Sequence, residues 1–136
     1  HAVGGSDAGA LLNGTTRNGA GGEGTADDGK TFRGYGDGDW LTLRLKRPCD
    51  LTEVRTFAGH QDARASQGYD VLVARAADPD AFVRVASGSK ACASGASDLR
   101  VPLKEAGVVA VRLAFRNGPQ GFNVYREVNL LGTPSR

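Results

Sequence analysis

Two polar segments hold the side chains of this chain that are best suited to binding chemistry. They lie at residues 59–68, which include His60, Gln61, Asp62 and Arg64, and at residues 116–123, which include Arg116, Asn117, Gln120, Phe122 and Asn123. Planar groups of this kind donate and accept hydrogen bonds, and an aromatic ring beside them can pack on the apolar face of a sugar ring. The alternative interpretation is a pair of ordinary solvated loops in which Phe122 fills the core.

A second set of residues offers oxygen ligands to a hard cation. Asn13-Gly14 is a turn signal, and the hydroxyls of Thr15 and Thr16 follow it. A tight turn exposes carbonyl oxygens, which Ca²⁺ accepts together with carboxylates. The loop acids Asp27, Asp28, Asp37 and Asp39 are alternative ligands.

Glu127 is unusual because it stands in a mostly apolar segment close to the end of the chain. An unpaired charge in a buried strand is costly, so this carboxylate needs a partner. We hypothesise that Glu127 faces the N-terminal segment and helps to hold a metal ion there. The alternative is an ion pair between Glu127 and an arginine.

Motifs for catalysis are missing from the sequence. No serine is flanked by glycines as in a nucleophile elbow. The glycines of Gly19–Gly24 lack the lysine that follows them in a phosphate loop. Paired carboxylates occur in the first glycine-rich stretch, but no pattern places them across a cleft. We therefore predict a noncatalytic protein.

The composition limits the class of protein and its partners. The length of 136 residues suits a single domain over residues 1–136, and the 20 glycines favour a loop-rich β protein. The net charge is only +2 and the basic residues are scattered, which argues against nucleic acid. No apolar run approaches the roughly 20 residues of a membrane span, so we expect no membrane partner. Because the chain has no methionine, we expect a mature form or a piece of a longer protein.

Short segments of alternating apolar and polar residues between polar loops predict an antiparallel β-sandwich. The expected strands are Trp40–Leu45, Leu51–Ala58, Tyr69–Ala74, Phe82–Ala86, Leu99–Leu103, Val108–Phe115 and Val124–Gly132. Alternation in the last strand predicts that Val124 and Val128 share one face and that Tyr125 takes the other, with Arg126 interrupting the pattern. Pro102 suits an edge strand because it cannot donate to a neighbour.

Cys49 and Cys92 each lie near an expected strand end. We favour a disulfide between them, which would remove roughly 4 kcal/mol of unfolded-state entropy. Such a bond indicates an oxidising compartment. The alternative is two unrelated thiols.

The order of the strands resembles that of discoidin-type domains, also called coagulation factor five/eight C-type domains. The resemblance rests on Asp39-Trp40-Leu41-Thr42-Leu43, on the closing Val124-Tyr125-Arg126-Glu127-Val128, and on Leu12-Asn13-Gly14, where the family usually has an Asp-Gly step. It covers roughly residues 11–132 and implies a jelly-roll β-sandwich. The chain departs from the family in its Asn-Gly step and in lacking the tryptophan that usually precedes the Trp40 strand.

Many bacterial members of that family are galactose-binding carbohydrate-binding modules of family thirty-two, attached to secreted glycoside-active enzymes. The resemblance therefore implies a module that binds a galactose-like glycan and belongs to a larger secreted or cell-surface protein. It implies one set of ligand-binding residues and one set of calcium ligands. The first set is His60, Arg64, Arg116, Asn117 and Phe122, and the second is Asn13, Thr15 and Glu127.

Two other functions remain open on the sequence. Many discoidin-like folds serve as structural or protein-interaction domains without a sugar site. A domain that binds lipid headgroups needs exposed apolar side chains at its loop tips. Only Phe32, Tyr35 and Phe122 are candidates for such side chains.

Overall fold

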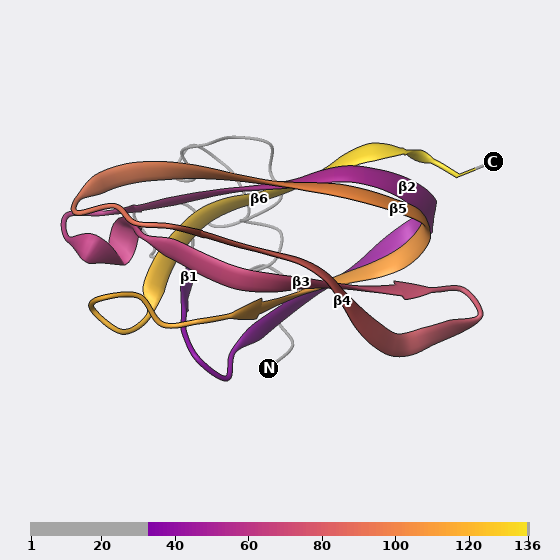
Figure 1. The fold of residues 1–136 in the computed structure, drawn as a ribbon, viewed down its shortest axis with the longest axis horizontal. Helices are drawn as coiled ribbons and strands as arrows, with labels where there is room; N and C mark the ends of the chain where they lie inside the picture. Colours follow the sequence, from indigo (N-terminus) through magenta and orange to yellow (C-terminus); the bar gives the residue numbers. More distant parts are fainter. Residues whose placement is uncertain (1–32, 136) are drawn as a thin grey trace.

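The computed structural model of the chain describes residues 33–135, which form an antiparallel six-stranded sheet that folds back on itself (Figure 1). The sheet has the strand order β1-β6-β2-β5-β3-β4. The strands are β1 (Arg33–Tyr35), β2 (Trp40–His60), β3 (Gln67–Arg75), β4 (Asp78–Lys90), β5 (Gly95–Phe115) and β6 (Asn123–Pro134), with a short 3₁₀ turn, η2 (Ala63–Ala65). The predicted antiparallel β-sandwich is confirmed. Within residues 33–135, no helix has the length and apolar character needed to cross a membrane.

Two long bent strands turn this one sheet into two layers. Figure 1 shows β2 and β5 side by side, curving together from the upper layer into the lower one. Their pairing shifts register between Arg44 and Glu53, and such bulges bend a strand without ending its pairing. The sequence predicted two separate strands in each of these stretches, because Lys46–Asp50 reads locally as a turn.

The two layers share β2 and β5 but differ in their other strands. Layer A contains β1, β6, the second half of β2 and the first half of β5. Layer B contains the first half of β2, the second half of β5, β3 and β4. The apolar core lies between the layers.

The core combines aliphatic side chains with an aromatic cluster at one end. Leu41 and Leu43 point inward from layer B, as the alternation in the sequence predicted, and Val54 faces them from layer A. The aromatic cluster consists of Tyr35, Tyr69, Phe115 and Tyr125. The rings of Tyr35 and Phe115 are stacked with their centroids 4.1 Å apart. These contacts bring β1, β3, β5 and β6 together near the polar loops.

A bulge in β6 overturns the predicted faces of the last strand. Phe57 of β2 pairs with Glu127, whereas the next residue, Ala58, pairs with Tyr125, so Arg126 is an extra residue. The extra residue lets both Tyr125 and Val128 face the core, although strict alternation would place them on opposite faces. The sequence predicted that Val124 and Val128 share one face. In the structure Val124 is buried, but it lies outside the core cluster that contains Val128.

The predicted disulfide is wrong. Cys49 and Cys92 are both free thiols. Cys49 pairs with Val108 at the bend of β2, whereas Cys92 contacts Ser66, near the other end of that strand. A separation of this many strand residues is on the order of 25 Å. Bridged cysteines need Cα atoms within about 7 Å of each other.

Candidate functional site

The two polar loops meet at one end of the sandwich. The guanidinium carbon of Arg64, from the first loop, lies over the ring of Phe122, from the second, at 5.1 Å from its centroid. Asp62 connects this pair to His60: its Oδ1 lies 2.9 Å from His60 Nδ1, and its Oδ2 accepts a hydrogen bond of 2.7 Å from Arg64 Nη1. We call His60, Asp62, Arg64 and Phe122 the loop-end site.

Asp62 positions its neighbours because it caps the turn η2. Its Oδ1 accepts a hydrogen bond of 2.9 Å from the backbone N–H of Arg64, as a short acidic side chain commonly does at the start of a turn. This backbone hydrogen bond, helped by the nearby charge of Arg64, keeps the pKa of Asp62 below its usual value of 3.8. The carboxylate is therefore charged at neutral pH and orients both His60 and Arg64.

A buried polar network fixes the turn to the sheet beneath it. The side-chain amide of Gln67 donates to Thr56 O (3.1 Å) and to Ser97 Oγ (3.0 Å), and its carbonyl oxygen accepts from the hydroxyl of Thr56. The hydroxyl of Ser97 donates in turn to Ala65 O, at the end of η2. Networks of this kind are stable only when every member has a partner, and Gln67 achieves this.

The second loop is held by the turn that joins β1 to β2. The backbone N–H of Asn117 donates to Asp37 Oδ1 (2.8 Å), and the backbone N–H of Asp37 donates to Asn117 Oδ1 (2.7 Å). The ring of Phe122 packs on Gly34, where a Cβ atom would lie only 2.7 Å from the ring. The residue Phe122 remains 47% exposed, so part of its ring is available to a ligand.

The structure gathers three of the five predicted ligand residues. His60, Arg64 and Phe122 lie together, whereas the side chain of Arg116 points to layer B. There it donates to Asp70 and to Gly88 O (3.3 Å). Asn117 stands beside the loop-end site but uses its side-chain oxygen for Asp37. The ligand roles of all five residues stay predictions.

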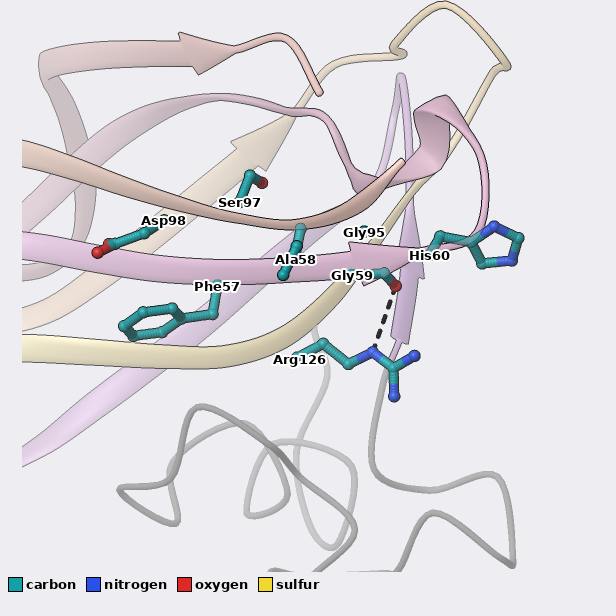
Figure 2. A pocket seen from close by; sticks show the side chains of 9 residues that line it. Phe57, Ala58, Gly59, His60, Gly95, Ser97, Asp98 and Arg126 are labelled. Atoms are coloured by element: carbon teal, nitrogen blue, oxygen red, sulfur yellow. Dashed lines mark hydrogen bonds between the residues drawn. The ribbon is translucent and has the colours of Figure 1, made fainter. Parts of the chain in front are cut away.

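A hollow of about 510 Å³ opens beside His60, a volume typical of small-molecule sites (Figure 2). Its lining comes from β2, β5 and β6: Phe57, Ala58, Gly59, His60, Gly95, Ala96, Ser97, Asp98 and Arg126. Figure 2 shows Arg126 next to Gly59, whose carbonyl accepts a hydrogen bond of 3.3 Å from Arg126 Nε. Burial lowers the pKa of Arg126.

Arg126 and Gln67 were not predicted as site residues. Arg126 was noticed only because it interrupts an alternating strand, which is itself a signal that such a residue has a special position. Gln67 gave no signal, because its partners Thr56 and Ser97 come from distant strands.

The predicted calcium ligands are only partly within the described residues. Asn13 and Thr15 lie outside them, and Glu127 is fully buried on β6 beside the bulge. A buried carboxylate is a donor of the kind that Ca²⁺ prefers, so Glu127 fits the role. Within residues 33–135 no three His, Cys, Asp or Glu side chains are grouped closely enough to hold a metal. The calcium site stays a prediction.

No protein-family sequence model matches the chain, and no curated protein sequence matches it significantly. A comparison with solved structures, in contrast, finds 13 matching chains. One is a family 32 carbohydrate-binding module (CBM32-1) from a family 31 glycoside hydrolase of Clostridium perfringens, with a TM-score of 0.60 and 8% identity over 98% of this chain and 87% of that one. The chain has the discoidin-like fold of the family 32 modules.

Two further structures share the discoidin-like fold. The family 32 module of AlyQ, in complex with 4,5-unsaturated mannuronic acid, has a TM-score of 0.55 and 14% identity over 90% of this chain and 83% of that one. A fucose-binding module of Streptococcus pneumoniae has a TM-score of 0.51 and 16% identity over 90% and 79% of the two chains. The predicted resemblance is thus confirmed at the level of the fold.

Proposed function

We propose that this domain is a noncatalytic carbohydrate-binding module whose ligand binds at the loop-end site. The observation that carries the proposal is the contact between Arg64 and Phe122, with His60 joined to it through Asp62. Two planar hydrogen-bonding groups and an exposed ring, brought from separate loops, are what a sugar-binding site requires. The solved structures with this fold include modules described with mannuronic acid and fucose.

We propose a galactose-like glycan as the ligand. The axial 4-hydroxyl of galactose leaves one face of the ring formed by C–H groups, which can pack on the exposed part of Phe122. His60 and Arg64 would then bind the hydroxyls at the edge of the sugar. Because Asp62 already orients both residues, little side-chain entropy is lost on binding.

The site is small and supports weak binding by a single domain. The site has one exposed ring, Phe122, and His60 is its only member that also lines the hollow of about 510 Å³, so it offers room for about one sugar unit. Such modules act by keeping a larger protein close to its glycan, and repeated modules raise the apparent affinity by avidity. We therefore propose that the domain belongs to a secreted or cell-surface multidomain protein. Calcium held by Asn13, Thr15 and Glu127 would serve to stabilise the fold.

One observation favours the alternative function, a structural or protein-interaction domain without a sugar site. Asp62 already occupies His60 Nδ1 and Arg64 Nη1, so these groups have partners before any ligand arrives. A glycan must therefore use the remaining donors of His60 and Arg64. Binding experiments decide between the two functions.

The test is a glycan array probed with the wild-type domain and with His60→Ala and Phe122→Ala. We expect the wild type to bind galactose-terminated glycans and each variant to bind about tenfold more weakly, because each loses a contact worth roughly 1–1.5 kcal/mol. Lys104→Ala is the control, since Lys104 is exposed on β5 and belongs to neither polar loop. Equal binding by all four proteins would place the site elsewhere, and no binding to any glycan would favour the structural alternative.

A further inference from the structure

The outer face of layer B carries arginine and aromatic side chains that the loop-end site does not use. These residues alternate with the core residues of the same strands, so they point away from the sandwich. They are Trp40, Thr42 and Arg44 of β2, Phe82 and Arg84 of β4, and Arg112 of β5. We call this set the arginine face.

Arg112 lies at the centre of the arginine face, between two rings. Its guanidinium carbon is 4.0 Å from the centroid of Phe82 and 5.4 Å from that of Trp40. Its Nε donates a hydrogen bond of 2.9 Å to Thr42 Oγ1. Stacking and this hydrogen bond fix the plane of the guanidinium, whose terminal Nη groups are the donors suited to a bidentate acceptor.

Among the residues that the structure describes, Arg112 has no carboxylate partner. None of the ion pairs found among residues 33–135 includes it. A half-buried cation without a counter-ion is unusual, because most buried charges are paired. The position is therefore prepared for an anion that none of residues 33–135 supplies.

The surroundings of Arg112 are also positive. Across the sheet, Thr42, Arg112, Leu72 and Arg84 form one row over four strands. Arg84 shares Asp70 with Arg116, and Arg44 pairs with the highly exposed Asp80. The three arginines of the arginine face and the neighbouring Arg116 thus have two aspartates, Asp70 and Asp80, between them as ion-pair partners. The side chains of Arg44 and Arg84 are 54% and 62% exposed, so a ligand can reach them.

We propose that the arginine face is a second binding surface, which takes an acidic polysaccharide through its uronate carboxylates. The carboxylate of one sugar unit binds Arg112 in the bidentate manner that guanidinium groups favour. The sugar rings on either side pack on Phe82 and Trp40, and Arg84 and Arg44 attract the neighbouring carboxylates. This surface runs across β2, β5, β3 and β4 on the outside of layer B and does not depend on the loop-end site.

Affinity electrophoresis in gels that contain polygalacturonate, or a neutral galactan, tests this surface. We expect polygalacturonate to retard the wild type and Arg112→Gln to bind about tenfold more weakly, with Arg112→Lys between them because it keeps the charge but loses the bidentate geometry. Arg100→Gln is the matched control, since Arg100 is an exposed arginine on the layer A part of β5. It should bind polygalacturonate like the wild type.

The two sites give different results in this experiment. His60→Ala should lose affinity for the neutral galactan and keep its affinity for polygalacturonate, while Arg112→Gln should do the reverse. The second surface is overturned if polygalacturonate does not bind, if Arg112→Gln binds it like the wild type, or if His60→Ala loses that binding instead. It is also overturned if Arg112→Gln changes only the oligomeric state in gel filtration, which would indicate a second copy of the chain on this face.

Discussion

The guanidinium of Arg64 lies 5.1 Å from the ring centroid of Phe122, although the two residues come from different loops of the chain. This contact joins the first polar loop to the second at one end of the sandwich. It depends on Asp62, which holds Arg64, and on Gly34, on which the ring of Phe122 packs. Each of these supports can be removed separately.

Replacing Gly34 by alanine should weaken glycan binding although Gly34 itself offers no side chain to a ligand. A Cβ atom at this position would lie 2.7 Å from the Phe122 ring, so the ring must move. Isothermal titration with a galactose-terminated oligosaccharide should show a loss of affinity of about tenfold, as for Phe122→Ala. Gly38→Ala is no suitable control, because Gly38 has a positive φ of 85°. An unchanged affinity in Gly34→Ala would show that the position of the ring does not matter.

Replacing Gln67 by leucine should destabilise the domain by about 2–4 kcal/mol, because Thr56 and Ser97 would lose buried hydrogen-bond partners. Urea denaturation measures this change in the free energy of unfolding. Gln61→Leu is the control, since Gln61 is exposed and should change the stability by less than about 0.5 kcal/mol. Equal stability of the two variants would contradict a structural role for the buried network.

Asp62 predicts a dependence of stability on pH. Its pKa is depressed in the folded protein, mainly by the hydrogen bond from the backbone N–H of Arg64. Its stabilising effect is therefore fully present above the usual pKa of 3.8 and is lost as the pH falls through the lower folded value. Denaturation over a pH series should show wild type more stable than Asp62→Asn at neutral pH, with the difference shrinking below pH 3.8. A difference that stays constant into acid would contradict this role.

Calcium binding can be tested through Glu127. If Glu127 is a ligand, a chelator should lower the melting temperature of the wild type, because an ion that binds only the folded state stabilises it. Glu127→Gln has nearly the same shape and should melt at one temperature with and without chelator. If the chelator leaves the melting temperature of the wild type unchanged, a stabilising ion is ruled out.

The sequence predicted much of the fold because the strands alternate strictly where one face is buried. Leu41 and Leu43 were recognised in this way, and both lie in the core. Pro102 was predicted at an edge, and the described part of β5 around it pairs with β2 alone. The polar loops could be recognised from their composition. That they meet follows from the antiparallel order, which brings both loops to one end of the sandwich.

The remaining features depend on tertiary contacts that have no local signature. The local sequence at the bends of β2 and β5 resembles a turn. Each strand continues through its bend because it pairs there with the other strand, and this pairing has no signal in the local sequence. The bulge at Arg126 reverses which side chains of β6 face the core on either side of it. Its position is set by the pairing of β6 with Phe57 and Ala58 of β2. The prediction of a disulfide was wrong for the same reason. The spacing of Cys49 and Cys92 along the chain does not show that they lie far apart in the fold.

An NMR titration of the ¹⁵N-labelled domain with the galactose-terminated oligosaccharide tests the loop-end site most directly. We predict that the amide shifts concentrate at residues 60–64 and at residues 117–122, and that Phe122→Ala needs about tenfold more ligand to reach the same shifts. The binding site proposed here would be contradicted if the shifts instead gathered around Asp50 and Ser135, which form a separate hollow with Gly107, or if no amide shifted at all.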